Sequence, residues 1–589
     1  MSYEITENCI VCRSPYGCIY NCPVHAIHFN GLQAEIDQSL CIKCGKCMSC
    51  CYLHAIRNTE APDPIIAPHD PTEITCDILI LGGGASGLTA ALRASECTDK
   101  KILILEKGKN LGGCGAYSAG LRVFGTAWEK EAGIPDQFDD YVRAAINTTR
   151  GLLDPQLIAA CYRAIPDFFD WFCEWGDAAD GFELDKTGAL NGIYVAAKKH
   201  DNAGRFITEK MIARCNALGI EYRLETAATD FIVEDGCVVG INASDPGGDL
   251  VIHCRAILIA TGNLGNSKEL HERCVPDFAD SYQRKSQHLL PTCTGDGVLM
   301  AERAGLPVNL SSIVPSYLGP GCGGPYHPQL MLQPDRADAL HVNLDGKRYY
   351  NEQQRGEICT WSLLKQPKCV TYTIFDKNLL TSVPVTAPKL LQDPTMGRVI
   401  SNGVPNWDGT PKTESSVIHL GFGRDMPVDP KLFEQDIQGQ VDELTHWQGG
   451  YAFKGDTLEE LAEQMGVPVD NFLATVHRYN ELCHKKHDDD FYKPAELMIP
   501  IEQGPFYAFH QFLPTDGTFG GLEVNYKMQL IDQTGTPVTG VYATGDTTGS
   551  RYINFGGEKR QIVNDYSWAL ASGYLAGLEL AQYINHLST

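Results

Sequence analysis

The sequence lacks several features that would place the chain in other protein classes. No uninterrupted apolar run reaches the roughly 18 residues that suggest a transmembrane helix, so we expect no membrane span. Basic residues are scarce: 48 Lys and Arg stand against 73 Asp and Glu. The resulting net charge of −25 argues against nucleic acid or an anionic membrane as a main partner. The start, MSYEITENC, has neither a basic segment nor an apolar secretory core, and we expect a cytoplasmic protein.

The composition is that of a globular protein with sizeable cores. Apolar residues make up 43% and charged residues 21% of the 589 residues, and this length predicts several domains. The chain is rich in one unusual residue, with 23 cysteines. In so long a chain without a secretory signal, cysteines indicate metal ligands and buried thiols in a reducing compartment rather than disulfides.

The stretch 77–113 predicts a strand, a glycine turn, a helix, a second strand and an acid. An apolar run ends in Gly82-x-Gly84-x-x-Gly87, an Ala- and Leu-rich segment of helical period follows, and a second apolar run ends at Glu106. In this pattern the glycines allow a tight turn, approach of a pyrophosphate and close helix packing, and the acid binds a ribose. The flanking strands and the placed acid favour dinucleotide binding over an ordinary glycine-rich turn.

Eight cysteines near the N-terminus form two similar runs. The tails Cys22-Pro-Val-His-Ala-Ile and Cys51-Tyr-Leu-His-Ala-Ile repeat, which indicates an internal duplication. The second run has the spacing C-x2-C-x2-C-x3-C, whereas five residues separate the second and third cysteines of the first run. The ligands expected from this pattern are Cys9, Cys12, Cys18, Cys22, Cys41, Cys44, Cys47 and Cys51.

The duplication resembles the bacterial ferredoxin pattern, in which the fourth cysteine of each run binds the other cluster. The resemblance implies two [4Fe–4S] clusters: one on Cys9, Cys12, Cys18 and Cys51, the other on Cys22, Cys41, Cys44 and Cys47. Tyr52 replaces the proline expected after the last ligand, and Cys50 is an adjacent spare thiol. A pair of structural zinc sites is the alternative, but zinc does not explain the crossed duplication.

Further segments resemble the flavoprotein family of fumarate reductases, urocanate reductases and 3-ketosteroid dehydrogenases. TGDGVLMAERAG (294–305) is similar to the second flavin motif of that family, and the segment 453–483 is similar to its capping-domain helices. GVYATGDTTG (540–549) is similar to the segment in which the chain of that family returns to the FAD-binding domain. The resemblance implies a Rossmann-like α/β FAD-binding domain (77–300 and 500–589) with an inserted α+β capping domain (301–499). A proline-rich linker (61–76) joins it to the ferredoxin-like domain (1–60).

The resemblance also implies the residues that hold FAD. No histidine lies between Lys101 and Lys130, where some relatives attach FAD covalently, so non-covalent FAD is expected. Asp546 ends the strand VYATGD and is expected to bind the ribityl or pyrophosphate part, although a simple helix N-cap is the alternative. The full expected set is Gly82, Gly84, Ala85, Ser86, Gly87, Glu106, Lys107, Gly112, Gly113, Thr261, Gly262, Thr294, Asp296, Gly545 and Asp546.

The stretch GKRYYNEQQRGE (346–357) resembles the family segment whose last arginine is the proton donor. That position falls on Arg355, and Arg336 is matched to a relay arginine, with Gln333 where the intervening acid is expected. A guanidinium is almost always protonated, so it acts as a donor only if a relay restores its proton. The alternative for Arg355 is a surface ion pair with Glu352 or Glu357.

The carboxylate clamp of fumarate reductases is not conserved in this chain. Asp516-Gly517-Thr518 stands in place of His-His-Thr, and Asn554-Phe555 in place of Asn-Arg. Two substrate carboxylates would be poorly neutralised, and an unpaired buried charge is costly, so fumarate is not the expected substrate. Four tyrosines are candidates for lining a bulky-substrate pocket, with ordinary packing as the alternative for each: Tyr117, Tyr317, Tyr326 and Tyr552.

Together these patterns predict an iron–sulfur flavoprotein reductase. Electrons from an external one-electron donor, such as ferredoxin or another redox protein, are expected to pass through the clusters and FAD to the C=C bond of a small enoate or enone. No second dinucleotide-binding unit is evident, so no separate NAD(P)H site is expected. Two alternatives remain: a ketosteroid-like dehydrogenase that passes electrons out, and an electron-transfer subunit of a larger complex.

Overall fold

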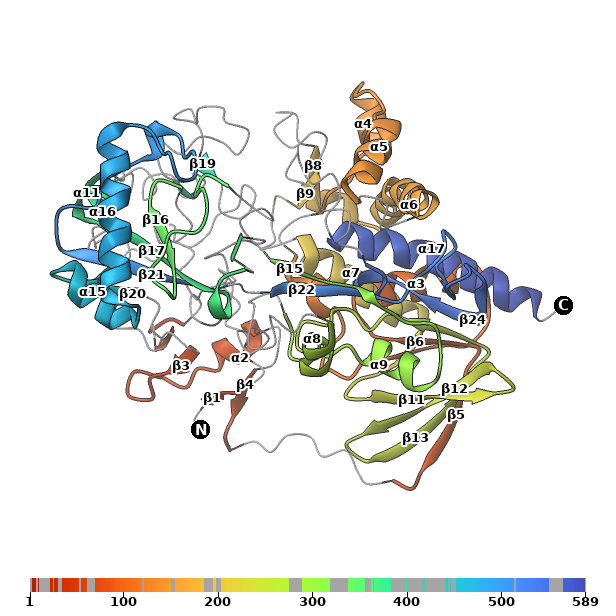
Figure 1. The fold of residues 1–589 in the computed structure, drawn as a ribbon. Coiled ribbons are helices and arrows are strands. Elements are labelled where there is room, and N and C mark those ends of the chain that lie inside the picture. Colours follow the sequence, from red (N-terminus) through yellow and green to blue (C-terminus); the bar gives the residue numbers. More distant parts are fainter. Residues whose placement is uncertain are drawn as a thin grey trace.

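The architecture is taken from a computed structural model of the chain. It describes residues 3–6, 9, 18, 22–24, 26–29, 34–51, 55–60, 69–118, 121–149, 154–184, 194–196, 203–274, 289–317, 337–354, 362–363, 365–382, 398–399, 417–418, 441–442, 445, 452–512, 515–549 and 565–587. These residues form a large lobe, a smaller lobe and an N-terminal segment that lies below the smaller lobe in the view of Figure 1.

The large lobe is built on a six-stranded sheet. Neighbouring strands are parallel except for the last pair, which is antiparallel. The order is β10 (Glu221–Arg223), β7 (Ile102–Leu105), β6 (Ile78–Leu81), β14 (Ala256–Ile259), β24 (Pro537–Ala543) and β23 (Gln529–Ile531). Every residue of β6, β7 and β14 is buried, as expected for parallel strands whose sheet is covered on both faces.

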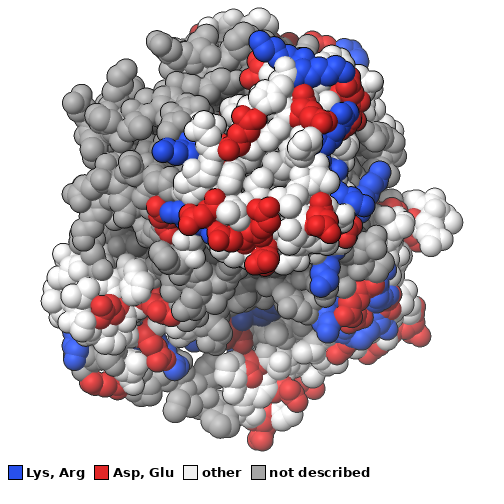
Figure 2. All heavy atoms as spheres, turned by 60° about the vertical axis from the view of Figure 1, so that its left-hand side comes forward, with Lys and Arg blue, Asp and Glu red and all other residues white. Residues whose placement is uncertain are grey.

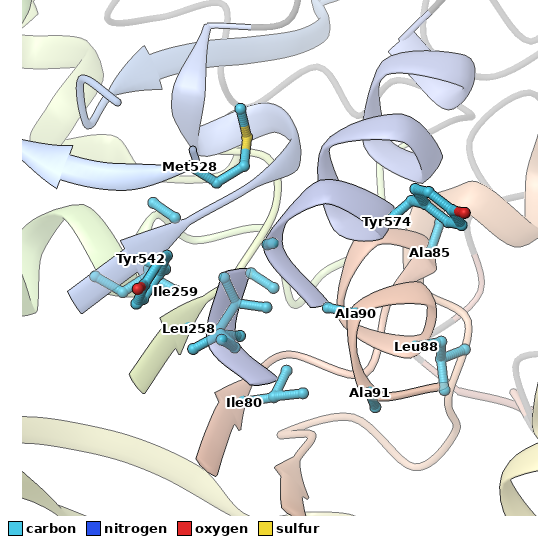
Figure 3. Close-up of a cluster of buried hydrophobic side chains, with 14 of the residues drawn as sticks. Ile80, Ala85, Leu88, Ala90, Ala91, Leu258, Ile259, Met528, Tyr542 and Tyr574 are labelled. Carbon is cyan, nitrogen blue, oxygen red and sulfur yellow. The ribbon is translucent and has the colours of Figure 1, made fainter. Parts of the chain in front are cut away.

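Two helices cover one face of this sheet, α3 (Ala85–Ser95) and α17 (Asp565–His586) (Figure 3). They approach closely, because a Cβ at Gly573 of α17 would lie 2.4 Å from the carbonyl oxygen of Ser86. A second sheet covers the other face, where β12 contacts β14 and β24. Its strands are β11 (Ala227–Glu234), β12 (Cys237–Asp245), β13 (Gly248–His253) and β5 (Thr72–Thr75).

Further helices complete the large lobe. The longest of them, α6, is apolar along its buried side, and Phe168, Phe169 and Phe172 of this helix are buried in the main core. A proline at its first position and the Asp154 side chain, which accepts from Gln156 N, define its start. These helices are α4 (Ala127–Glu131), α5 (Phe138–Thr149), α6 (Pro155–Cys173), α7 (Ala203–Leu218), α8 (Lys268–Cys274) and α9 (Asp296–Arg303).

The smaller lobe is an antiparallel sheet with its own core. The strand order is β16 (Leu340–Asn343), β17 (Val370–Asp376), β21 (Phe506–Phe512) and β20 (Ala452–Gly455). The helices α15 (Leu458–Met465) and α16 (Val469–Lys485) supply Leu461, Phe472 and Val476 to the core. β21 follows the domain boundary expected at residue 499, yet it pairs with two strands of this sheet.

An antiparallel pair of strands lies between the two lobes in Figure 1. β15 (Asn309–Tyr317) pairs with β22 (Thr515–Gly521), so the stretch that replaces the His-His-Thr of fumarate reductases is a strand. The backbone of Gly517 is opposite Ser316, and that of Thr518 is opposite Pro315.

The N-terminal segment forms two small strand pairs. β1 (Tyr3–Ile5) pairs antiparallel with β4 (Ile56–Asn58), and β2 (Ile27–Phe29) pairs antiparallel with β3 (Ala34–Ile36). The short helix α2 (Lys46–Cys50) lies between β3 and β4 in sequence. The first strand of the segment therefore pairs with its last, and the two sequence repeats meet in one unit.

Among the described residues, no helix combines the length and the apolar character needed to cross a bilayer. On the face drawn in Figure 2, acidic and basic side chains of the described residues are intermixed.

Candidate functional site

Four segments that are distant in sequence meet at the carboxyl ends of the parallel strands β6, β7, β14 and β24. Open α/β sheets bind ligands at this edge. The Gly112 N–H donates to the Gly83 carbonyl (2.8 Å), which joins the turns after β7 and β6. The Thr544 N–H donates to the Ile259 carbonyl (3.0 Å), which joins the ends of β24 and β14.

The glycine turn after β6 has the geometry that the motif predicts. Gly82 has φ of +107°, and a Cβ there would lie 2.3 Å from the Ala260 carbonyl oxygen. A Cβ at Gly87 would lie 2.0 Å from the Gly82 carbonyl oxygen, so only glycine lets α3 start this close to the strand. Gly84 is the N-cap of α3 and makes no side-chain cap hydrogen bond, which leaves the helix start suited to an anion.

Glu106 is held by backbone groups at the end of β7. Its two carboxylate oxygens accept hydrogen bonds from Gly83 N (3.0 Å) and Gly108 N (2.7 Å). Burial raises the pKa of Glu106, opposed by these two N–H groups and by the charge of Lys107. A buried carboxylate beside the glycine turn is an acceptor for ribose hydroxyls, and their hydrogen bonds would stabilise its charged form.

Lys107 joins the end of β7 to the start of α9. Its ammonium donates to the Thr294 hydroxyl and to the Asp296 carboxylate, and the Thr294 hydroxyl donates to the other oxygen of Asp296 (2.7 Å). All three residues were predicted from sequence motifs to bind FAD. Their mutual contact fixes the second flavin motif against the first.

The C-terminal strand closes the site against α3. A Cβ at Gly545 would lie 2.9 Å from the Ser86 hydroxyl, and the Gly545 N–H donates to the Ser572 hydroxyl of α17 (3.1 Å). Within the described part of the chain, the buried hydroxyl oxygens of Thr261 and Thr544 have no hydrogen-bond partner. Because an unpaired buried hydroxyl is unfavourable, both are suited to meeting a polar ligand.

These residues fit FAD. The uncapped helix start suits a pyrophosphate, the buried Glu106 suits a ribose, and the unpaired hydroxyls of Thr261 and Thr544 are available to the remaining polar groups. Of the other predicted residues, Ala85 and Ser86 begin α3, and the rest lie in the turns that follow the strands: Gly112, Gly113, Gly262 and Asp546.

The predicted cluster ligands gather in the core of the N-terminal segment. Cys47 is buried with the apolar side chains of Tyr3, Ile27 and Ile56. Five more predicted ligands pack against this small core: Cys9, Cys18, Cys22, Cys41 and Cys51. Cys44 is exposed, and Cys12 lies outside the described residues.

The two repeats also share a hydrogen bond to sulfur. The Ala26 N–H donates to Cys22 Sγ (3.2 Å), and the Ala55 N–H donates to Cys51 Sγ (3.3 Å). Hydrogen bonds of this kind to cysteine sulfur are among the features that tune iron–sulfur clusters. No group of three or more His, Cys, Asp or Glu side chains has the spacing of a metal site within the described residues.

A buried ion network anchors the segment that precedes Arg355. The Arg348 guanidinium makes paired hydrogen bonds to Glu352 (2.8 and 2.8 Å) and to Asp488 (3.1 and 2.7 Å). Lys493 Nζ lies 3.6 Å from Glu352 and donates to the Tyr479 hydroxyl (3.0 Å). Both oxygens of Glu352, the suggested surface partner of Arg355, are therefore bonded to Arg348 in the interior.

Replacing Arg348 is expected to destabilise the smaller lobe strongly. Arg348→Met leaves the buried carboxylates of Glu352 and Asp488 without their guanidinium, at a cost of about 3–5 kcal/mol. Thermal unfolding followed by circular dichroism measures the change. Arg478→Met is the matched control, because Arg478 pairs with Asp490 at the surface and its loss is expected to change stability little. Equal effects of the two variants would contradict the network's importance.

The network also sets a pH dependence. Burial alone would raise the pKa of Asp488, but the hydrogen bonds from Arg348 and backbone N–H groups outweigh it and lower the pKa to about 2. The stabilisation is therefore complete above the ordinary value of 3.8 and is lost as the pH falls through about 2.

Several predicted residues lie outside the described part of the chain. They are the proposed proton donor and relay, Arg355 and Arg336, with Tyr326, Tyr552, Asn554 and Phe555. The backbone of Tyr317 ends β15, whereas its side chain lies outside the described part of the structure. Tyr117 ends the short 3-10 turn 113–117 that follows β7.

A family profile described as an FAD-binding domain matches residues 77–555. The chain belongs to this FAD-binding family. The match covers the first part of the predicted FAD unit, the inserted segment and the second part as far as residue 555, and it confirms the predicted flavoprotein family. The iron–sulfur part of the prediction lies outside the matched residues.

Vinyl phenol reductase from Lactiplantibacillus plantarum is 24% identical to this chain over an alignment of 541 residues, which covers 89% of this chain and 99% of that protein. Urocanate reductase from Eggerthella lenta is 24% identical over 82% of this chain and 72% of its own length. The fold is similar to that of a flavocytochrome c3 fumarate reductase solved in its open conformation, with a TM-score of 0.60, 21% identity and coverage of 87% of this chain and 79% of that one. FAD-dependent oxidoreductases that act on C=C bonds are thus the relatives of this chain.

Sequence reasoning missed one close pair in this site. Cys114 Sγ and Cys293 Sγ are 3.3 Å apart, although 179 positions separate them in the chain. Each flanks a predicted FAD residue, Gly113 and Thr294 respectively. The only sequence signal was that each cysteine adjoins a flavin motif.

Proposed function

We propose that the chain is an iron–sulfur flavoprotein reductase that transfers electrons from an external one-electron donor, through two [4Fe–4S] clusters and FAD, to the C=C bond of an enoate or enone. The observation that carries the proposal is the assembled FAD cradle of a family whose relatives are C=C reductases. FAD supplies hydride chemistry when it is bound. The residues of the protein then bind FAD and the substrate, orient them and protonate the substrate.

The cysteine-rich segment supports the iron–sulfur part of the proposal. Six of the eight expected ligands share one small core, and the two repeats carry the same N–H to sulfur hydrogen bond at Cys22 and Cys51. A pair of zinc sites would not explain why the two cysteine runs are duplicated in the ferredoxin pattern, in which the fourth cysteine of each run binds the other cluster. FAD takes up two electrons, and single-electron centres at the N-terminus would link it to a one-electron donor.

An exposed apolar surface around the second cysteine run supports an external donor. Leu40, Ile42 and Met48 are among the large apolar residues exposed in the described chain, at 52%, 59% and 37%. Cys44 and the two lysines of this loop, Lys43 and Lys46, are exposed as well. A basic and apolar loop on a protein of net charge −25 is suited to an acidic redox protein.

The substrate is proposed to be an unsaturated ketone or monocarboxylate rather than fumarate. Asp516 stands in β22 where fumarate reductases have a His-His-Thr stretch, and Phe555 replaces the arginine of their clamp. An acid in place of the histidines and a phenylalanine in place of the arginine would leave a second substrate carboxylate poorly neutralised, and an unpaired buried charge is costly. Arg355 is proposed to protonate the α-carbon after hydride transfer to the β-carbon.

The test is anaerobic turnover with reduced viologen against enoates, enones, 4-vinylphenol and fumarate. We expect an unsaturated ketone or monocarboxylate to reoxidise viologen, and fumarate to be a poor acceptor. Arg355→Ala is expected to lower turnover by about 10²-fold or more, because general acid catalysis contributes at least that much. Gln354→Ala is the neighbouring control. Full turnover of Arg355→Ala removes the proton-donor assignment, and preferred oxidation of saturated ketones favours the dehydrogenase.

A further inference from the structure

Two thiols meet at the edge of the FAD cradle. Cys114 lies in the 3-10 turn 113–117 after β7, and Cys293 lies three residues before α9. Their sulfur atoms are 3.3 Å apart. A disulfide needs about 2.05 Å, so an approach of roughly 1.2 Å would join them.

The pair is surrounded by the segments assigned to FAD. A Cβ at Gly113, directly before Cys114, would lie 3.1 Å from Gly84 Cα at the start of α3. Thr294, directly after Cys293, binds Lys107. Besides the hydrogen bond to Cys114 and burial, the negative charge of Asp546, in the turn after β24, also contributes to raising the pKa of Cys293. The two sulfurs therefore lie where the turn after β7 contacts the segment before α9.

The two thiols differ in access. Cys293 is 6% exposed, and Cys114 is half-buried. The hydrogen bond to Cys114 and burial raise the pKa of Cys293, so its thiol is protonated at neutral pH. An external reagent therefore meets Cys114 first, and Cys293 is placed to react from the interior.

We propose that Cys114 and Cys293 form a reversible, redox-responsive disulfide that cross-links the FAD cradle. The oxidant is a low-molecular-weight disulfide. The Cys114 thiolate attacks one sulfur of this reagent, forms a mixed disulfide and releases one thiolate. Cys293 gives up its proton and attacks Cys114 Sγ, which forms the protein disulfide and releases the second thiolate. The dithiol loses two electrons, and the reagent gains them with the two protons as two thiols.

The cross-link is expected to control how readily FAD leaves. It ties together two walls that are 179 positions apart, and so restricts the opening that releases a bound dinucleotide. The oxidised protein is expected to release FAD at least about tenfold more slowly than the reduced protein. This consequence rests on the proposed position of FAD, whereas disulfide formation does not depend on it or on the clusters.

The test uses the full-length protein with FAD, equilibrated anaerobically with glutathione and glutathione disulfide at several ratios, then alkylated after denaturation and digested. Mass spectrometry is expected to show a Cys114–Cys293 linked peptide, lighter by two hydrogen atoms than the two thiol peptides. Cys161 and Cys215, which are buried elsewhere in the main core, are expected to stay reduced and serve as internal controls.

Variants separate the chemistry from its consequence. Cys114→Ser and Cys293→Ser are each expected to abolish the linked peptide and to make FAD release insensitive to the glutathione ratio. A stable glutathione adduct on Cys114 with Cys293 still alkylated overturns the proposal, as does the absence of any reaction at the most oxidising ratio. A linked peptide with unchanged FAD release overturns the cofactor control.

Discussion

Gly87→Ala is expected to abolish FAD binding and to destabilise the large lobe. The new methyl group would lie 2.0 Å from the Gly82 carbonyl oxygen and 3.2 Å from Ile80 Cγ2. Both atoms belong to β6 or its turn and cannot move without disturbing the sheet, so α3 must shift away. Overpacking of this kind costs about 1–3 kcal/mol or more, and the shift displaces the helix start. The FAD content of the purified protein measures the loss.

Gly84→Ala provides the matched variant, because it changes the same turn without a clash. Gly84 has φ of −75°, and the nearest heavy atom to a new Cβ is Gly113 Cα at 3.9 Å. We expect a melting temperature close to that of the unchanged protein without FAD. Affinity for FAD is expected to fall at least about tenfold, because the methyl group stands at the pyrophosphate approach. Unchanged FAD affinity would show that this helix start does not bind the pyrophosphate.

Cys51→Ser is expected to remove one iron–sulfur cluster and leave FAD in place. The anaerobically purified protein should contain about eight iron atoms per chain, and the variant about four. Because Cys51 is assigned to the cluster of Cys9, Cys12 and Cys18, electron paramagnetic resonance should retain the signal of the other cluster. Turnover with a protein electron donor is expected to be lost, because single electrons no longer reach the flavin.

Two control variants accompany this measurement. Cys50→Ser changes the adjacent spare thiol, and Cys97→Ser changes an exposed cysteine of the large lobe, so both should keep all the iron. Loss of iron in Cys50→Ser but not in Cys51→Ser would exchange the two assignments. Zinc in place of iron in the unchanged protein would remove the iron–sulfur proposal while leaving the FAD site untouched.

The sequence alone was sufficient to predict those features that depend on residues close together in the chain. The unit from β6 through α3 to Glu106 was predicted in full, because hydrophobic runs, turn glycines and helical period act over a few residues. The duplicated cysteine runs are likewise a local pattern, and their assignment as paired cluster ligands stays a prediction.

The tertiary structure decided which distant residues meet. Lys107 contacts Thr294 and Asp296, Arg348 binds Asp488 across 140 positions, and β21 joins the sheet of the smaller lobe. Local patterns carry no information on such contacts, because they depend on how separately formed elements pack.

The Cys114–Cys293 pair shows this division most clearly. Each cysteine is an unremarked residue beside a flavin motif in the sequence, and only the packing of the turn after β7 against the segment before α9 brings the two sulfurs to 3.3 Å. The sequence by itself determined the FAD-binding turn and the family. The packing of elements that are far apart in the chain decided which other residues surround that turn. Residues distant in sequence become neighbours only when the sheet and its helices have assembled.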